Sequence, residues 1–324
     1  SIRLGRLAQT LRRLADAGYR DFYEGEIAAD LVKDAEDLGI PLTAGDLAGY
    51  QPHLTPVERG FYRGHEIDVV PGLTAGPTLE AALRTLESHL PDPGTTPGVD
   101  AYQAYARTLF DAFDHRLAYV GDVPDSGPAA HTTHLAVADR DGNLVALTMT
   151  LLSLFGSKVM MPRTGVLMNN GMMWFDPRPG RPNSIAPGKR PLSNMCPTIL
   201  LRDDGQRFAL GASGGRRIMP AVFQLISFLT DYGMNVGDAM HQPRLDISGT
   251  ELVTLDERLP PAVIERLTQL HQTRVRPNGV YPNLFACPGI VGFDPASGRS
   301  SGAAFIASPR AAAVAEAHRD NGSA

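Results

Sequence analysis

The chain has 324 residues, 43% of them hydrophobic and 20% charged, a composition typical of a globular protein with a substantial core. Its net charge of −5 lacks the basic excess of a nucleic-acid-binding protein, and no apolar run of about 18 residues predicts a membrane span. The two cysteines, Cys196 and Cys287, form no disulfide framework, and two free thiols are the favoured interpretation. Neither nucleic acid nor a membrane is therefore an expected partner.

The first 118 residues are predicted to be mostly helical. Leucines recur at helical spacing in the first segment, and Thr43 has the pattern of an N-cap because Asp46 follows three residues later. The predicted elements are helices over 3–17, 22–38, 77–88 and 100–118, a strand over 64–71, and loops over 91–98 and 121–131. The last of these loops has no hydrophobic periodicity and is expected to be exposed.

A hairpin is predicted at the centre of the chain. Asp141-Gly142-Asn143 lies between two apolar, β-branched runs, a strong signal for a β-hairpin. Thr132 and Thr133 stand at the entry to the first strand and Thr150 ends the second, so the three are candidates for one polar cluster at the rim of a sheet. Downstream we predict strands near 157–161, 164–169, 197–203, 207–212, 284–293 and 302–307, and helices near 217–232 and 260–271.

Threonine at this place allows a particular chemistry. A hydroxyl is a weak nucleophile unless a base lies beside it. If the bond before Thr132 is cut, the freed α-amine, with an unperturbed pKa of about 7.7–8.0, can serve as that base. An ordinary edge strand also accounts for these threonines, and spacing alone does not decide whether the bond is cut.

Two further segments are candidates for a site. Gly211 to Gly215 joins a predicted strand to a helix, where backbone N–H groups form either an oxyanion site or an ordinary tight turn. The same residues match G-x-S-x-G, which makes Ser213 an alternative nucleophile with His241 or His271 and a later acid as partners. Against this, the flanking sequence lacks the alternation of strands and helices that is typical of a doubly wound sheet. Ser193 and Asn194 offer polar atoms either to a ligand or to their own loop. No histidines have metal-ligand spacing, and no metal or cofactor is expected.

These motifs occur together in one known family. Thr132-Thr133-His134, Gly165 to Asn170, Pro191-Leu192-Ser193, Gly211 to Gly215 and Asp231 to Val236 resemble the γ-glutamyltranspeptidase family in order and spacing. The resemblance covers almost the whole chain. It implies an α+β fold, the four-layer αββα sandwich of the N-terminal-nucleophile hydrolases.

The resemblance also implies a division of the chain. Residues 1–131 would be the C-terminal part of a large subunit and residues 132–324 the small subunit, both forming one domain. Because the chain starts at Ser1, the N-terminal part of the large subunit is expected to be absent, and the cellular location stays open. The expected assembly is a heterodimer cut from one zymogen, with a higher oligomer as an open alternative.

Within this family, cleavage is autocatalytic and is expected here between His131 and Thr132. Thr132 would be the nucleophile, its freed amine the base, Thr150 the residue that orients the hydroxyl, and Gly214 and Gly215 the oxyanion donors. The acyl-enzyme then passes to water or to an amine. The substrate is expected to be a small amide or peptide, in chemistry that belongs to glutathione metabolism.

The departures from the family concern the substrate. The predicted substrate-binding residues are Leu152, Asn170, Gly171, Trp174, Ser193 and Asn194. At Leu152, Gly171 and Trp174 the family has an amide, an amide and a carboxylate that hold the glutamyl group, and their loss predicts a more apolar acyl group, as in related acylases. The alternatives are a serine hydrolase using Ser213 and an inactive, unprocessed relative or scaffold.

Overall fold

The computed structural model describes residues 4–120, 130–249, 251–279, 284–305 and 311–316. The chain divides into two compact units. The smaller unit consists of residues 1–55 and 150–171, and the larger unit consists of residues 56–149 and 172–324. The predicted loop over 121–131 lies outside the described residues except for its last two positions, which are extended backbone.

The smaller unit begins with helices that the leucine pattern predicted, with one difference. The predicted helix over 22–38 is broken at Gly25, where a β-carbon would overlap the Asp21 side chain. The Asp21 carboxylate accepts the backbone N–H groups of Glu26 and Ile27 at 3.2 Å, and the Arg13 guanidinium lowers the pKa of Asp21 to about 2. The helices are α1 (Leu7–Ala17), α2 (Asp21–Glu24), α3 (Glu26–Leu38) and α4 (Ala44–Ala48).

Residues 150–171 complete the smaller unit, and here two predicted strands are wrong. The segments 157–161 and 164–169 form one isolated bridge, Met160 to Leu167, within a series of turns. The reason is Gly165, which adopts a φ of +72° and lies so close to the backbone at Leu4 that a side chain would overlap it. Met161 is buried with Ile27, Leu31 and Ala35 of α3 in a small core.

The larger unit is built on a six-stranded sheet in which each described pairing is antiparallel. Its spatial order is β1-β2-β5-β6-β10-β11, so strands from both halves of the chain are neighbours. The strands are β1 (Glu58–Tyr62), β2 (His65–Val69), β5 (Thr198–Leu201), β6 (Arg207–Ser213), β10 (Cys287–Asp294) and β11 (Arg299–Ala304). All but β1 overlap a predicted strand, although β11 begins before the predicted range of 302–307.

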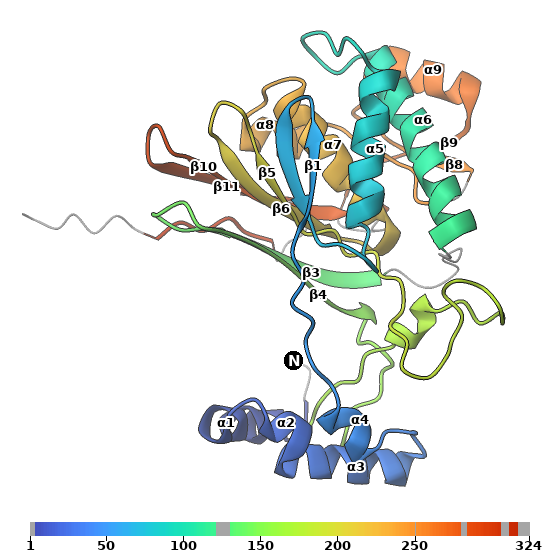
Figure 1. The fold of residues 1–324 in the computed structure, drawn as a ribbon. Coiled ribbons are helices and arrows are strands. Elements are labelled where there is room, and N and C mark those ends of the chain that lie inside the picture. Colours follow the sequence, from blue (N-terminus) through green and yellow to red (C-terminus); the bar gives the residue numbers. More distant parts are fainter. Residues whose placement is uncertain (1–3, 121–129, 250, 280–283, 306–310, 317–324) are drawn as a thin grey trace, which may run out of the picture. The chain divides into compact units, whose positions relative to one another are not determined.

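Helices cover one face of this sheet (Figure 1). The most buried of them is α7, in which every residue from Ile218 to Leu229 is inaccessible, because this apolar helix lies between the sheet and the other helices. The helices of this layer are α5 (Gly76–His89), α6 (Val99–His115), α7 (Ile218–Thr230) and α8 (Val236–His241). A π-helical turn, η1 (Arg116–Val120), continues α6, so the predicted helix over 100–118 is correct in position but changes its geometry at the end.

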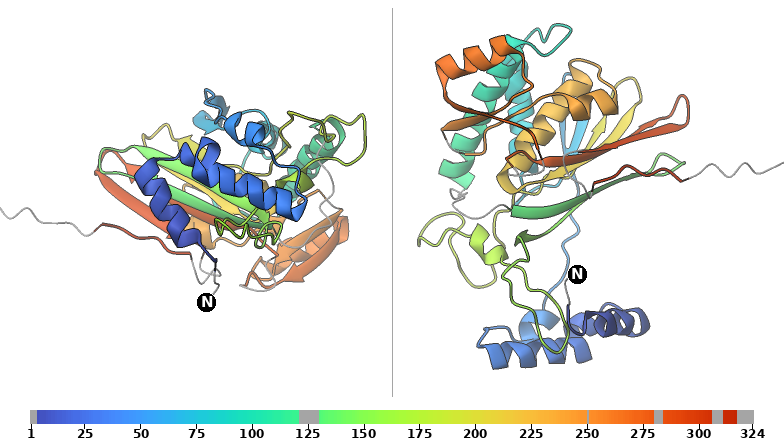
Figure 2. Two further views of the ribbon diagram at one scale, coloured as in Figure 1. Left: turned by 90° about the horizontal axis from the view of Figure 1, so that it is seen from below. Right: turned by 180° about the vertical axis from the view of Figure 1, so that it is seen from behind.

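The predicted central hairpin is confirmed as β3 (Ala130–Ala138) and β4 (Leu144–Ser153), of which the residues to Met149 belong to the larger unit. The hairpin lies on the sheet face opposite the helices (Figures 1 and 2). The described part of the larger unit therefore has helical, sheet and hairpin layers, in agreement with the predicted α+β class. Cys196 and Cys287 are both free thiols, as expected.

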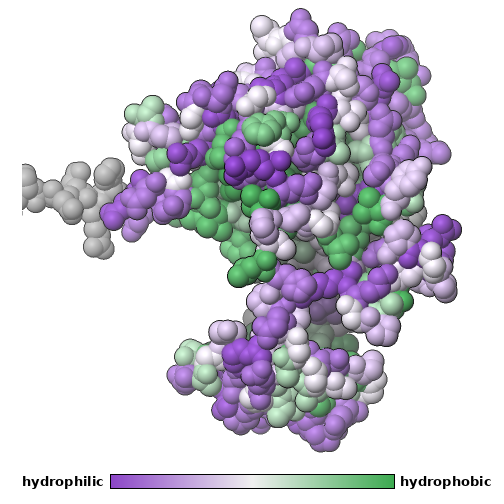
Figure 3. All heavy atoms as spheres, in the orientation of Figure 1, coloured by the Kyte–Doolittle hydropathy of each residue, from purple (hydrophilic) through white to green (hydrophobic). Residues whose placement is uncertain are grey.

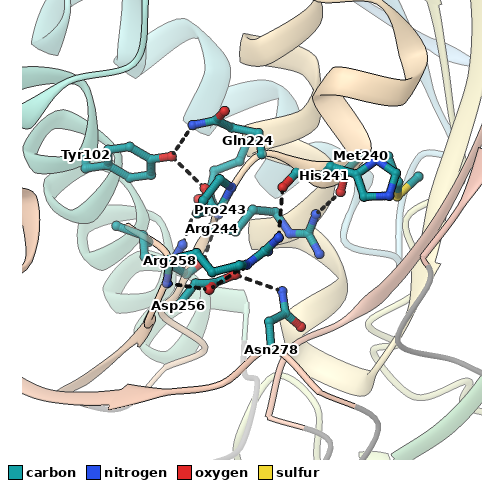
Figure 4. A network of polar contacts seen from close by, with 11 residues as sticks. Tyr102, Gln224, Met240, His241, Pro243, Arg244, Asp256, Arg258 and Asn278 are labelled. Carbon is teal, nitrogen blue, oxygen red and sulfur yellow. Dashed lines mark hydrogen bonds and ion pairs between the residues drawn. The ribbon is translucent and has the colours of Figure 1, made fainter. Parts of the chain in front are cut away.

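A small three-stranded sheet beside α6 was not predicted. It consists of β7 (Leu245–Asp246), β8 (Leu252–Asp256) and β9 (Gln272–Arg276), with α9 (Pro261–Leu270) between the last two. The Tyr102 hydroxyl of α6 donates to the Pro243 carbonyl at 2.5 Å, and Asp256 accepts from Arg258 at 2.6 Å and from Asn278 at 3.2 Å (Figure 4). This polar network anchors α6, whose end leads into the candidate site.

Candidate active site

Thr132 lies near the start of β3, on the face of the strand that is turned toward the six-stranded sheet. Exposure alternates along β3, so that Thr132, His134 and Ala136 are partly buried while Leu135 and Val137 are exposed. The inward direction is fixed by His134, whose ring packs so closely on Gly211 of β6 that a β-carbon there would overlap it. Because side chains two residues apart share a face, the Thr132 hydroxyl points to the same side as this ring.

Contacts along the hairpin determine which end of β6 lies under Thr132. Gly142, at the hairpin turn, packs on Phe293, which pairs with Arg207 at the start of β6. His134, nearer the beginning of β3, packs on Gly211, close to the end of β6. Thr132 is therefore at the end of β6 where the predicted glycine pair follows.

The glycine pair forms a turn in which a side chain at Gly214 would be strained. Gly214 has a φ of +141° and Gly215 a φ of +63°, and a β-carbon at Gly214 would lie 3.0 Å from the Cα of Ala286. The turn leads into the short 3-10 helix η3 (Gly215–Arg217), and Cα atoms of η3 come within 8 Å of β3. The structure thus brings the predicted nucleophile and the predicted oxyanion donors to one end of the β3–β6 layer pair.

His134 is a structural residue that packs between two layers. Burial lowers its pKa to about 4, so the ring is neutral at physiological pH. Its Nδ1 shares a 3.0 Å hydrogen bond with the Thr148 hydroxyl of β4, and its Nε2 has no hydrogen-bond partner among the described residues. Because the His134 ring is packed between the hairpin and the six-stranded sheet and stays neutral, it is unsuited to proton transfer.

Ser193 and Asn194 lie in a segment held against the loop before α5. The Ser193 N–H and hydroxyl both donate to the Leu73 carbonyl, at 2.9 and 3.1 Å. Arg116 donates to the Ser193 carbonyl at 2.7 Å and to the Asn194 Oδ1 at 3.3 Å. Ser193 is buried and its hydroxyl is engaged in the loop, whereas the Asn194 side chain is half-exposed.

Trp174 is connected to the same segment through one buried amide. The Asn183 Nδ2 donates to the Trp174 carbonyl at 2.6 Å, and the Asn183 Oδ1 accepts the Leu192 N–H at 3.1 Å. Leu192 directly precedes Ser193. Trp174 and the Ser193–Asn194 pair are therefore parts of one hydrogen-bonded assembly.

The remaining predicted residues belong to the smaller unit. The Thr150 hydroxyl accepts the Leu152 N–H at 2.8 Å, and Leu152 has a φ of +73°, which is unusual for a leucine. The Asn170 amide donates to the Ser153 hydroxyl at 2.8 Å and accepts the Ser153 N–H at 3.0 Å. Gly171 donates its N–H to the Asn169 side chain. Asn170 thus holds the turn that follows β4, a structural task that the sequence did not indicate.

Comparison with known proteins identifies the family. A family model described as Gamma-glutamyltranspeptidase matches residues 2–129 and 123–283. The chain belongs to the gamma-glutamyltranspeptidase family. The predicted resemblance is thereby confirmed, and the relatives below include proteins named as hydrolases and as acylases.

Two curated relatives and one solved structure illustrate the range of the gamma-glutamyltranspeptidase family. The Glutathione hydrolase proenzyme of Escherichia coli (strain K12) is 31% identical, and the Acylase ACY 1 proenzyme of Pseudomonas sp. (strain SE83) is 34% identical. These alignments cover 74% and 80% of this chain but 50% and 53% of the relatives, so the chain spans about half their length. The cephalosporin acylase from Bacillus halodurans has a TM-score of 0.82 at 26% identity, covering 93% of this chain and 61% of that one.

The structure does not favour Ser213 as the nucleophile of this gamma-glutamyltranspeptidase family member. An α/β-hydrolase elbow needs a parallel sheet, whereas β6 is paired antiparallel with both β5 and β10. His241 Nδ1 bonds to the Gly237 carbonyl at 2.8 Å, and the His271 ring lies 5.1 Å from that of Phe110. Among the described contacts, neither histidine reaches Ser213.

The sequence pointed to no role for Arg116 or Asn183, two polar residues of this site. Arg116 follows a helical pattern and resembles the solvated basic residue that often ends a helix, yet it is 1% exposed.

Within the described ranges, no cluster of histidine, cysteine, aspartate and glutamate can hold a metal ion. No helix in the described part of the chain is long and apolar enough to cross a membrane.

Proposed function

We propose that this chain is the catalytic part of an autoprocessed N-terminal-threonine amidohydrolase or acyltransferase, with Thr132 as the nucleophile. The observation that carries the proposal is the position of Thr132, on the inner face of β3 above the end of β6 that leads to Gly214 and Gly215. That arrangement supplies a hydroxyl and two backbone N–H groups for acyl transfer. Family membership supports the same chemistry.

The proposed mechanism begins with cleavage between His131 and Thr132, which frees the α-amine. This amine takes the proton from the Thr132 hydroxyl as its oxygen attacks the amide carbonyl, while Thr150 orients the hydroxyl. Gly214 and Gly215 donate N–H groups to the developing oxyanion, each worth about 2.7–4 kcal/mol in comparable sites. The amine then returns its proton to the leaving nitrogen, and the ester intermediate passes its acyl group to water or to an acceptor amine.

The α-amine is a better candidate for the base than His134, whose ring is unsuited to the task. Burial lowers the pKa of His134 to about 4, and its Nδ1 is occupied by Thr148. An α-amine titrates at about 7.7–8.0 when unperturbed, close to the pH at which a general base works best.

For the substrate, we favour an acyl group less polar than γ-glutamyl, in an altered glutamyl site. Leu152 and Trp174 have apolar side chains, and Gly171 has none, where the family has two amides and a carboxylate. The relatives named as acylases support this choice, and those named as glutathione hydrolases support γ-glutamyl amides as the second candidate. In the larger unit, Asn194 is our candidate for a polar contact with the acyl group, since its side chain is only partly buried.

The proposed assembly is a heterodimer of a large subunit ending at residue 131 and a small subunit starting at residue 132, in a four-layer αββα sandwich. The outer face of the hairpin supports a fourth layer, because its hydrophobic side chains are exposed (Figure 3). Leu135 is 48% and Val137 52% exposed, and Val145, Leu147 and Met149 are similar. We expect helices to cover this face in the assembled protein.

The deciding experiment compares Thr132→Ala with Ser213→Ala in the full-length protein. A denaturing gel reports cleavage, and release of p-nitroaniline from γ-glutamyl-p-nitroanilide and from hexanoyl-p-nitroanilide reports turnover. Thr132→Ala is expected to leave one uncut band and no turnover, whereas Ser213→Ala retains both activities. Turnover by Thr132→Ala, or its loss in Ser213→Ala alone, would overturn the proposal.

A further inference from the structure

Arg116 has a charge that the proposed reaction does not use. Its guanidinium is almost completely buried, at 1% exposure, at the first position of the π-helical turn η1. Removing such a charge from water costs several kcal/mol, so it persists only where good acceptors surround it. Single π-helical turns within helices are also frequent at functional sites.

The acceptors of Arg116 come from two separate segments of the larger unit. One nitrogen, Nη1, donates to the Thr74 carbonyl and to the Thr78 hydroxyl, both at 3.1 Å. The other, Nη2, donates to the Ser193 carbonyl at 2.7 Å and to the Asn194 Oδ1 at 3.3 Å. The guanidinium therefore joins the start of α5 to the pair of residues predicted to bind the substrate.

Two backbone hydrogen bonds connect the same segments. The Ser193 N–H donates to the Leu73 carbonyl at 2.9 Å, and the Ala75 N–H donates to the Met195 carbonyl at 3.0 Å. These bonds fix the backbone but leave the direction of the Asn194 side chain free. In the structure that direction is set by Arg116, which is the donor to the Asn194 oxygen. With its oxygen held in this way, the amide has a fixed orientation.

The ordered assembly extends beyond Asn194. Leu192 precedes Ser193 and donates to Asn183, which in turn donates to the Trp174 carbonyl. Asn183 is buried, so this link is protected from water. Two residues predicted to contact the acyl group, Asn194 and Trp174, are consequently held by one polar chain that starts at Arg116.

We propose that Arg116 is a positioning residue that holds the Leu192–Asn194 segment, and through Asn183 also Trp174, in the geometry that binds the acyl group. The inference rests on the proposed function, because it takes Asn194 and Trp174 as substrate contacts. Arginine suits this task since its planar fork donates in several fixed directions at once. Lysine keeps the charge but is a compact donor on a flexible stem, and cannot reach all four acceptors in that geometry.

The test compares Arg116→Lys with Arg244→Lys. Arg244 is also 1% exposed and lies in the larger unit, but its described hydrogen bond goes to the Met240 carbonyl and not to the Leu192–Asn194 segment, which makes it a control for burying a lysine. Arg116→Lys is expected to raise KM for both anilides about tenfold while kcat changes less than about threefold. The size of the KM effect corresponds to the loss of a hydrogen bond donated by a charged group. Arg244→Lys is expected to change KM less than twofold at a similar loss of stability.

A second measurement does not depend on activity. In protein labelled with 5-fluorotryptophan, the ¹⁹F resonance of Trp174 reports whether the surroundings of this side chain are ordered. The resonance is assigned with the Trp174→Phe variant. Arg116→Lys is expected to shift or broaden it, and Arg244→Lys to leave it unchanged. A KM within twofold of the parent together with an unchanged resonance in Arg116→Lys would overturn the inference.

The outcomes separate this inference from the proposed function. If Thr132→Ala retains turnover, the proposed function fails, while the Trp174 resonance still decides whether Arg116 orders the loop. If Arg116→Lys does not fold, Thr78→Val replaces it, because this near-isosteric change removes one acceptor of the guanidinium. Thr78→Val is then expected to raise KM about threefold and to shift the Trp174 resonance, and the absence of both effects would contradict the inference.

Discussion

At the scale of single residues, the candidate site depends on positions where only one type of side chain fits. Gly211 makes room for the His134 ring, and Gly214 makes the turn beside Ala286. The motif identifies both glycines from the sequence, whereas no sequence pattern indicates Arg116, because a basic residue after a helix is usually solvated. The described acceptors of Arg116 come from residues about 40 and 77 positions away, and the fold alone brings them together.

The turn at Gly214 gives the first prediction. Gly214→Ala is expected to lower kcat about 100-fold, because a φ of +141° and the contact with Ala286 force the turn to move and misplace the oxyanion donors. Gly205→Ala is the control, since Gly205 has a φ of +87° in a hairpin turn but open space around it. Anilide kinetics and the melting temperature are measured for both. A Gly214→Ala protein with parental kcat would show that the turn takes no part in the reaction.

His134 gives a prediction about acid stability. Its pKa falls from 6.5 in the unfolded chain to about 4 in the fold because of burial. The unfolded state therefore binds the proton more tightly, so folding stability is lost as pH decreases from about 6.5 to about 4, by up to about 3 kcal/mol. Urea unfolding of the parent and of His134→Gln at pH 7 and pH 4.5 measures this term.

The comparison with His134→Gln isolates this histidine from other acid-sensitive groups. Asp246, for example, has its pKa raised to about 6 by burial, which contributes in the opposite direction over part of the same range. The parent is expected to lose more stability than His134→Gln between the two pH values. Equal losses would mean that folding does not lower the pKa of His134.

At the scale of elements, sequence motifs that involve only a few neighbouring residues predicted the secondary structure correctly. The Asp-Gly hairpin and the N-cap at Thr43 both formed, and the N-cap has the complete capping box with Asp46. Strands 157–161 and 164–169 did not form, because Gly165 packs against the start of α1 in a conformation closed to other residues. The small sheet of β7, β8 and β9 was missed, since its strands are short and one pairs in parallel across α9.

The capping box gives a prediction for one helix. Thr43→Ala removes the side chain that accepts the Asp46 N–H and is expected to destabilise α4 by about 1 kcal/mol. Hydrogen exchange of the amides in Ala44–Ala48 is the direct measurement, because the effect is local. Thr95→Ala, in an exposed loop, serves as the control and should leave the exchange rates of α4 unchanged.

At the scale of the whole molecule, we propose that the departures from the gamma-glutamyltranspeptidase pattern change which acyl group the protein binds. Trp174→Asp restores a carboxylate where the family has one and is expected to shift the ratio of kcat/KM for γ-glutamyl over hexanoyl anilide at least tenfold toward the glutamyl compound, since a charged contact is worth about 1.5–3 kcal/mol. Trp174→Phe keeps an apolar ring and should preserve the parental ratio. A parental preference for γ-glutamyl anilide, unchanged in Trp174→Asp, would contradict the altered site.

The sequence by itself determined the family, the mixed helix and strand class, the central hairpin, most helices, and which residues are candidates for acyl transfer. These depend on periodicity, turn chemistry and motif order, which are carried by neighbouring residues. The tertiary structure decided that Thr132 faces inward above the end of β6, that His134 is a packing residue, and that Arg116 holds the Ser193–Asn194 pair. Those features depend on contacts between segments far apart in the chain, and burial, the factor that changes the pKa of His134 and orders Arg116, exists only once the layers have assembled.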